Sequence, residues 1–128
     1  MSALSITTIQ ANLIWEDKAA NLYALEQKIN SIQDPTEIVV LPEMFSTGFS
    51  MQPSLFAETM EGETLNWMKK VSTQNKIILT GSIIIEEEGK YYNRLIWMLP
   101  NGEYGYYDKR HLFAFGKKIN FITQATSV

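Results

Sequence analysis

The chain has 128 residues with a formal net charge of −3, and 45% of them are hydrophobic, which is typical of one globular domain and excludes a disordered or collagen-like chain. The mildly acidic charge argues against nucleic acid or an anionic membrane as the main partner. There is no cysteine, no apolar run of about 18 residues and no secretory signal, so disulfides and thiolate zinc sites are excluded within these residues and a cytoplasmic protein without a membrane span is expected.

The first third of the chain is typical of a β-α-β unit. Residues 4–10 are short and β-branched, which predicts a strand. Asp17 is a candidate N-cap for a helix that runs to about residue 32. Apolar residues three and four apart predict one buried stripe on this helix: Ala19, Leu22, Leu25, Ile29 and Ile32. Residues 37–41 then form a continuous apolar strand, which we expect to lie centrally and parallel to the first strand.

The rest of the chain predicts one more helix and then antiparallel strands. Residues 42–53 are loop-like, and a helix is expected over residues 63–75, with Glu63 near its positive N-terminal end. Three strands follow, joined by turns at 86–90 and 100–102: residues 76–85, 91–99 and 104–107. The order β-α-β-loop-α-β-β-β indicates an α/β fold.

Glu43 is a candidate catalytic residue because of its position. It follows Leu41-Pro42 at the C-terminal end of a buried strand, the edge where open α/β sheets build their sites. Its apolar neighbours Met44 and Phe45 predict a raised carboxyl pKa, which would suit a residue that transfers protons. The alternative is a solvated acid on a loop.

Lys109 is a candidate cation that would stabilise negative charge developing on a substrate oxygen. The alternative is a solvated basic loop, or local pairing of Asp108 with a base. His111 is the single histidine, and we expect it to be a hydrogen-bonded structural residue. Because one histidine is too little for a metal site, no metal is expected.

Two further groups of side chains have structural explanations. Glu86, Glu87 and Glu88 lie at the tip of a predicted hairpin, where a solvated turn explains them better than a cation site. The aromatic residues of the last strands are expected to form a packed sheet face: Tyr91, Tyr92, Trp97, Tyr104, Tyr106 and Tyr107.

Two motifs occur together in this chain, Ile38-Val-Val-Leu-Pro-Glu43-Met-Phe and Tyr107-Asp-Lys-Arg-His-Leu-Phe. Between them lie three shorter ones: Gly81-Ser-Ile, Tyr92-Asn93 and Pro100-Asn-Gly102. In this order, and after a β-α-β start, they resemble the nitrilase superfamily of carbon–nitrogen hydrolases. The longer stretch from Leu41 to Met51 looks like the omega-amidase branch of that superfamily.

The resemblance implies a fold, a site and a reaction. Family members form a four-layer α-β-β-α sandwich, of which residues 1–116 would be the N-terminal half, a truncated domain. They carry a Glu-Lys-Cys triad without a cofactor or metal. Carried over, Glu43 is the general base and acid and Lys109 stabilises the oxyanion. The cysteine attacks the amide carbonyl, ammonia leaves, and water hydrolyses the thioester. The implied substrate is a small omega-amide of a 2-oxo dicarboxylic acid.

The chain departs from the family pattern in its nucleophile. The triad cysteine would lie beyond Lys109, and the chain has none, so these 128 residues alone are expected to be inactive. Two alternatives stay open: a non-catalytic chain or small α/β interaction module, and an amidase of the same family with another small amide substrate. Half a sandwich would expose apolar sheet and open edges, which predicts self-association or a homo-oligomer.

The last segment, residues 117–128, also departs from the pattern. It has no cap and no clear period. One back-translation with a single added base restores a family-like sequence that ends in cysteine, which predicts a one-base deletion near codon 118. A deliberate cut or a natural half-domain is the alternative explanation.

Overall fold

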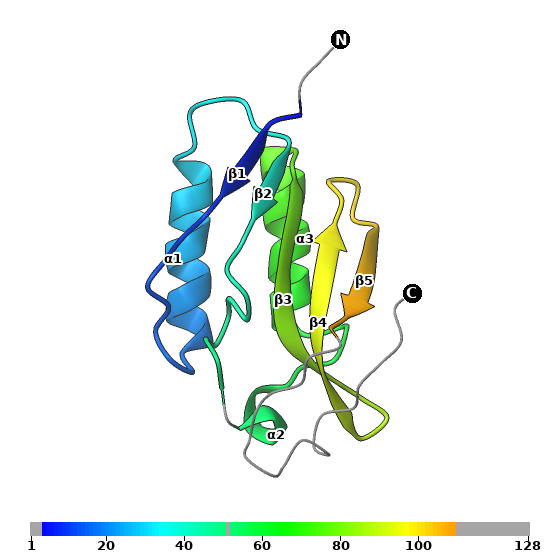
Figure 1. The fold of residues 1–128 in the computed structure, drawn as a ribbon. Helices are drawn as coiled ribbons and strands as arrows, with labels where there is room; N and C mark the ends of the chain where they lie inside the picture. The colour runs from blue at the N-terminus through cyan, green and yellow to red at the C-terminus, as the bar shows by residue number, and fades with distance from the viewer. Residues whose placement is uncertain (1–3, 51, 110–128) are drawn as a thin grey trace.

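The computed structural model describes residues 4–50 and 52–109 (Figure 1). It confirms the predicted order of strands and long helices. The strands are β1 (Ile6–Thr8), β2 (Ile38–Val40), β3 (Ile78–Glu87), β4 (Lys90–Met98) and β5 (Tyr104–Asp108), and the helices are α1 (Lys18–Asn30), the short α2 (Pro53–Phe56) and α3 (Glu63–Asn75). The predictions for His111 and for residues 117–128 lie outside the described residues.

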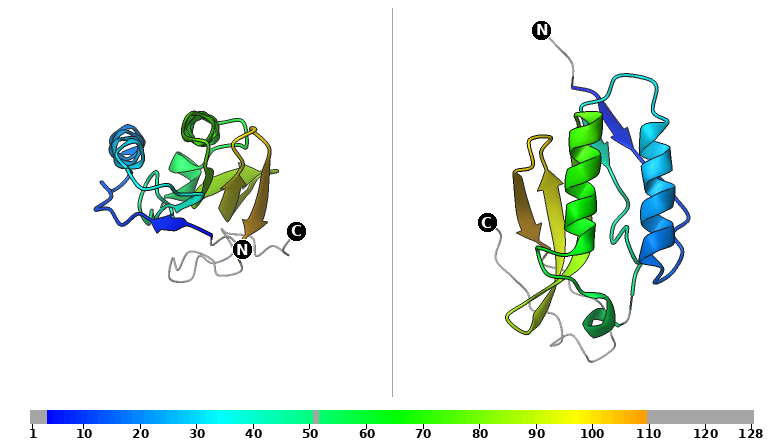
Figure 2. Two further views of the ribbon diagram at one scale, coloured as in Figure 1. Left: turned by 90° about the horizontal axis from the view of Figure 1, so that it is seen from above. Right: turned by 180° about the vertical axis from the view of Figure 1, so that it is seen from behind.

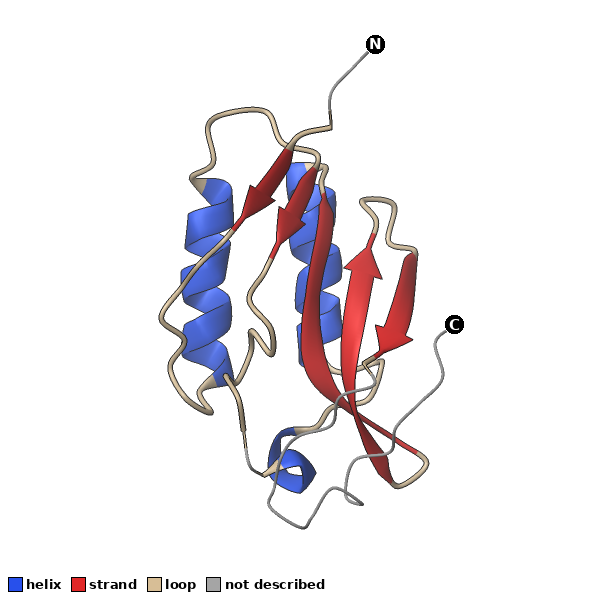
Figure 3. Ribbon diagram, viewed as in Figure 1, coloured by secondary structure: helices blue, strands red, loops and turns tan. Residues whose placement is uncertain are grey.

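The five strands form one mixed sheet in the order β1-β2-β3-β4-β5 (Figure 3). The predicted parallel pairing of β1 with β2 is confirmed, and β3 is parallel to β2 in turn. β4 and β5 add to β3 as antiparallel strands. Residues 37–41 were expected to lie centrally, and β2 is an interior strand with a partner on each side. The middle strand of the five is β3, because the chain passes through α3 and returns on the far side of β2.

Both long helices lie on the same face of the sheet (Figure 2). Parallel β-α-β connections are almost always right-handed, so two successive crossovers in one direction along the sheet place their helices on one side. Alternate residues of the long strands face these helices and form the core: Leu79, Ile83, Ile85, Ile96 and Met98. One helix layer on one sheet layer is half of the expected four-layer sandwich.

The buried stripe of α1 differs from the predicted one at both ends. Leu22, Leu25 and Ile29 are buried as predicted. Ala19 is exposed, and Ile32 lies beyond the end of the helix, where it is half-buried against the core. No helix of the described part of the chain has the length and apolar character needed to cross a membrane.

The two long helices begin with different caps. Asp17 caps α1 as predicted, since its side chain accepts a hydrogen bond from the Ala20 N–H at 3.1 Å. Gly62, the N-cap of α3, has no side chain for this purpose. The carboxylate of Glu58 accepts from the Thr64 N–H instead, at 2.8 Å, and also pairs with Lys18 at 2.9 Å. This salt bridge ties the start of α3 to α1.

The aromatic residues of β4 and β5 are only partly packed. Tyr106 packs against the core, as expected. Trp97 and Tyr104 are 40% and 44% exposed, so the prediction of a packed face was wrong for these two. Strand alternation turns Trp97 away from the helices. Beside it lies an apolar hollow of about 440 Å³.

Candidate active site

Glu43 and Lys109 lie side by side at one end of the sheet, as members of one catalytic triad would. β2 and β5 run in the same direction, because two antiparallel pairings separate β5 from β3. Glu43 and Lys109 each follow the carboxyl end of one of these strands. The Lys109 Nζ lies 3.1 Å from the Glu43 Oε2, and the two side chains are 35% and 57% exposed. The tertiary structure therefore joins two residues that are far apart in the sequence.

Asn93 of β4 connects both residues. Its side-chain Nδ2 donates to the Glu43 Oε2 at 2.8 Å, and its backbone carbonyl accepts from the Lys109 N–H at 2.9 Å. Asn93 is 4% exposed. Asn93 belongs to the Tyr92-Asn93 motif, which by itself indicated no role for it. The available signal was an amide side chain in a mostly apolar strand, where a buried polar group needs a partner.

The pKa of Glu43 is shifted in the opposite direction to the prediction. Burial acts to raise the pKa of this carboxyl, but the hydrogen bonds from Asn93 and Lys109 and the charge of Lys109 together lower it below its ordinary value. The apolar neighbours Met44 and Phe45 are buried in the protein, whereas the Glu43 side chain points outward. Glu43 is therefore a carboxylate at neutral pH, the form in which it can accept a proton.

The loop that carries Glu43 is held by β3. Met44 has a left-handed φ of +51°, a rare conformation for this residue type. The Met44 N–H donates to the Ser82 Oγ at 2.9 Å. The ring of Phe45 lies directly on Gly81, so close that a Cβ there would be 2.7 Å from a ring carbon. These contacts fix the backbone on the C-terminal side of Glu43.

The helix layer holds the same loop from the other side. Asn21 is a polar residue on the buried side of α1 and is 2% exposed. Its Nδ2 donates to the backbone carbonyls of Ile14 and Ser46 at 2.7 and 2.9 Å, and its Oδ1 accepts from the Ile14 N–H. The apolar spacing of the helix gave no indication of this residue. A site loop anchored from both layers keeps its side chains in a constant geometry.

Arg94 lies next to Asn93 in sequence but faces the other side of the sheet. It is 2% exposed, and its guanidinium binds both carboxylate oxygens of Asp108 at 2.6 and 2.9 Å. It also pairs with Glu87 at 2.8 Å and lies 4.1 Å from the centre of the Tyr106 ring. The pKa of Arg94 is raised, because these carboxylates outweigh the effect of burial.

The contacts of Arg94 bear on two expectations from the sequence, one for Asp108 and one for Glu87. Asp108 does pair with a base, but the base is Arg94 on the neighbouring strand, and Lys109 pairs with Glu43 instead. Glu87 was expected to be a solvated turn residue, and the salt bridge to Arg94 gives it a structural partner as well. The β4–β5 register places Arg94 opposite Asp108.

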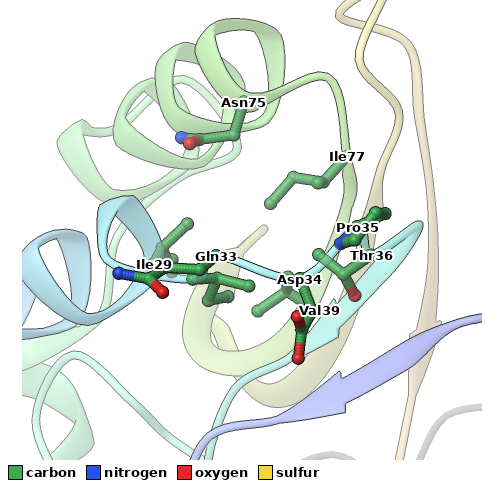
Figure 4. A pocket seen from close by; sticks show the side chains of 9 residues that line it. Ile29, Gln33, Asp34, Pro35, Thr36, Val39, Asn75 and Ile77 are labelled. Carbon is green, nitrogen blue, oxygen red and sulfur yellow. The ribbon is translucent and has the colours of Figure 1, made fainter.

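A separate cavity of about 280 Å³ lies at the opposite end of β2 and β3, beyond their amino ends (Figure 4). Its lining combines apolar side chains such as Ile29 and Ile77 with polar ones such as Asp34 and Asn75. None of the residues selected for catalysis lines it. Among the described residues no cluster of three or more histidine, aspartate or glutamate side chains could hold a metal ion.

Comparisons with known proteins agree on one family. Residues 5–126 match the model of the carbon-nitrogen hydrolase family. Omega-amidase YafV of Escherichia coli (strain K12) is 34% identical over 113 residues, and that of Yersinia enterocolitica is 37% identical over the same length. Each alignment covers 88% of this chain and 43% of the relative. The chain therefore spans less than half the length of these curated relatives.

Solved structures show the same fold. The crystal structure of XC1258 from Xanthomonas campestris, a CN-hydrolase superfamily protein with an arsenic adduct in its active site, has a TM-score of 0.88 and 34% identity to this chain. The match covers 100% of this chain and 48% of that protein. Nit3 of Saccharomyces cerevisiae, a member of branch 10 of the nitrilase superfamily, has a TM-score of 0.82 and 26% identity.

Proposed function

The chain belongs to the carbon–nitrogen hydrolase family, and we propose that it carries the general base and the oxyanion-stabilising cation of an amidase site. The observation that carries this proposal is the pair of Glu43 and Lys109, 3.1 Å apart at the carboxyl edge of the sheet. A carboxylate beside a cation supplies a proton acceptor next to a stabiliser of negative charge, which are two requirements of amide hydrolysis.

In the proposed reaction the Glu43 carboxylate accepts the proton of a thiol nucleophile. The thiolate attacks the amide carbonyl carbon, and the Lys109 ammonium stabilises the oxyanion that forms. Glu43 then gives its proton to the leaving nitrogen, so that ammonia departs and a thioester remains. Water, deprotonated by Glu43, hydrolyses the thioester and releases the acid.

The nucleophile is not among these residues. The sequence contains no cysteine, so the proposed reaction needs a cysteine from polypeptide outside the 128 residues. We expect the chain on its own to lack amidase turnover. The residues it contains would then contribute two of the three members of the triad.

The proposed substrate is a small omega-amide of a 2-oxo dicarboxylic acid. The omega-amidases at 34–37% identity support this choice. A different small amide within the same family is the alternative, and the (R)-stereoselective amidase of Pseudomonas sp., 27% identical over 99 residues, favours a wider range of amides. We further propose that the site needs neither metal nor cofactor.

A chimera tests the proposal. The 113 aligned residues of this chain replace their counterparts in the E. coli omega-amidase, and ammonia release is measured from 2-oxoglutaramate and from a panel of other small amides. We expect turnover that falls by about 10²–10⁴-fold in Glu43→Gln and by about 10²–10³-fold in Lys109→Met. Lys28→Met, on the exposed side of α1, is the control and should leave turnover unchanged.

The outcome separates the competing functions. A folded chimera without turnover on any amide would contradict the proposal and favour a non-catalytic interaction module. Turnover on the panel but not on 2-oxoglutaramate would favour the alternative amide substrate. Turnover that survives both substitutions would show that Glu43 and Lys109 are not the catalytic pair.

A further inference from the structure

The two oxygens of the Glu43 carboxylate have different environments. Oε2 accepts the hydrogen bond of Asn93 at 2.8 Å and also lies 3.1 Å from the Lys109 Nζ. No donor among residues 4–50 and 52–109 is bonded to Oε1. The Glu43 side chain is 57% exposed, and Oε1 is the oxygen without a donor in the described part of the chain.

Asn93 is a buried polar residue whose hydrogen-bonding groups are only partly satisfied. Its side chain is buried, and of its two polar atoms Oδ1 has no hydrogen-bond partner in the described part of the structure. A buried acceptor without a partner opposes folding, because it has lost its hydrogen bond to water. An apolar side chain of similar size, such as leucine, would avoid this loss. The hydrogen bond of Nδ2 to Glu43 is the compensating contact.

We propose that Asn93 is a positioning residue, which binds Oε2 of Glu43 so that Oε1 is the oxygen that transfers the proton. The proton-transfer role of Oε1 rests on the proposed function, whereas the positioning by Asn93 rests on the contacts alone. Asn93 also accepts the Lys109 N–H with its backbone carbonyl. One strand residue therefore sets the positions of both members of the pair.

The charged groups around Glu43 do not provide this selection by themselves. Lys109 is the charged residue paired with Glu43, and its flexible ammonium can bind either carboxylate oxygen. Arg94 is turned to the helix side and is occupied by Asp108 and Glu87. From β3, the nearby Ser82 is neutral and binds the Met44 N–H. The fixed amide of Asn93 is therefore the group that distinguishes Oε2 from Oε1.

The first test uses the 128-residue chain and needs no substitution. The chemical shift of the Glu43 carboxyl carbon (Cδ) is followed by NMR through a pH titration, together with the side-chain NH₂ signals of Asn93. We expect the Asn93 signals to change with the same midpoint as Glu43, because the hydrogen bond strengthens when the carboxylic acid of Glu43 ionises to a carboxylate. Asn93 NH₂ chemical shifts that stay constant while Glu43 titrates would overturn the proposal.

The second test compares Asn93→Leu with Thr80→Val. Each substitution removes a hydrogen bond of a side chain that is 4% exposed. Thr80, however, donates to the Ile96 carbonyl at 2.8 Å and has no hydrogen bond to Glu43. We expect Asn93→Leu to raise the Glu43 titration midpoint without lowering the thermal midpoint of unfolding. Thr80→Val should lower the thermal midpoint and leave Glu43 unchanged. The reverse pattern would make Asn93 a structural residue.

The chimera separates this proposal from the proposed function. With Asn93→Leu in an active chimera, we expect kcat to fall and the acid limb of the kcat–pH profile to move to higher pH. An unchanged profile despite a shifted Glu43 midpoint would overturn the role of Oε1. If the chimera is inactive while both NMR results hold, the amidase proposal fails and the positioning of Glu43 by Asn93 stands.

Discussion

Two polar clusters lie on opposite sides of β4. They are built from residues that are adjacent in sequence, since Asn93 precedes Arg94 and Asp108 precedes Lys109. On the helix side, Arg94 is 2% exposed and its guanidinium binds Asp108 through two hydrogen bonds. On the other side, Asn93 and Lys109 share one oxygen of Glu43, and both ionic side chains remain partly exposed. The first cluster pairs its charges in the protein interior, whereas the second leaves one carboxylate oxygen of Glu43 without a donor among the described residues.

The two faces of β4 therefore differ in role: one carries a buried stabilising ion pair and the other carries the candidate catalytic pair. A buried ion pair depends strongly on both partners, because the loss of either leaves an uncompensated charge out of water. A partly exposed pair contributes little to folding, since water replaces the missing partner. Substitutions in the Arg94 cluster should therefore affect unfolding, and those at Glu43 and Lys109 should affect titration and catalysis. Five predictions test this division and the contacts around it, beginning with the largest effect.

Asp108→Asn should destabilise the fold most. Arg94 would keep its burial and lose its principal counter-charge, which we expect to lower the free energy of unfolding by about 3–5 kcal/mol. Urea denaturation measures the effect. The control is Glu87→Gln, since Glu87 is 48% exposed and a pair at the surface contributes about 0–1 kcal/mol. Equal losses in the two variants would contradict the structural role of the buried pair.

Gly81→Ala should have the second largest effect, and it acts on the loop beside Glu43. A Cβ at this position would lie 2.7 Å from the Phe45 ring. Because Phe45 is fully buried, the overpacking should cost about 1–3 kcal/mol in urea denaturation. Gly105→Ala on β5 is the matched control, as its Cβ would meet no atom within 4 Å. A harmless Gly81→Ala would mean that the loop is less firmly held than its contacts indicate.

Lys109→Met should change titration more than stability. The pair is partly exposed, so the free energy of unfolding at pH 7 should fall by less than about 1 kcal/mol. The Glu43 pKa should rise, because the substitution removes the charge and the hydrogen bond of Lys109, two causes of its lowering. NMR titration of Glu43 measures the shift, and an unchanged midpoint would contradict the ion pair.

The same variant has a defined pH dependence. A carboxyl whose pKa is lowered in the folded state contributes stability above its unfolded value, about 4.5, and loses it as the pH falls through the folded pKa. The stability difference between the parent and Lys109→Met should therefore shrink at lower pH. Urea denaturation from pH 3 to 7 measures it, and a difference that grows toward acid would contradict the sign.

The smallest expected effect concerns association. We propose that the chain self-associates through the sheet face opposite the helices, where Trp97 is 40% exposed beside the apolar hollow. Size-exclusion chromatography with light scattering should show a concentration-dependent mass that Trp97→Lys reduces. Tyr23→Lys, on the exposed side of α1, is the control and should leave the mass unchanged. A strictly monomeric parent would contradict this proposal.

Local patterns in the sequence were sufficient for the elements and for two site candidates. The helix predicted over residues 63–75 has those bounds, and Asp17 caps α1 as predicted. Caps and apolar spacing act within a few residues, so they are readable without the fold. Glu43 was selected because it follows a buried strand, whereas the role of Lys109 came from the resemblance carried by its motif. The strand limits were less predictable, because β1 and β2 pair over three residues each, within longer segments whose composition also suits a strand.

Tertiary structure decided which side chains meet. The β4–β5 register gave Asp108 to Arg94 and left Lys109 for Glu43, and strand alternation turned Asn93 toward the site and Arg94 away from it. The predicted pKa direction of Glu43 was wrong for the same reason, since apolar neighbours in sequence were outweighed by partners from β4 and beyond β5. Sequence determined the chemistry available to this protein. Pairing across strands, which depends on contacts far apart in the chain, decided how that chemistry is arranged.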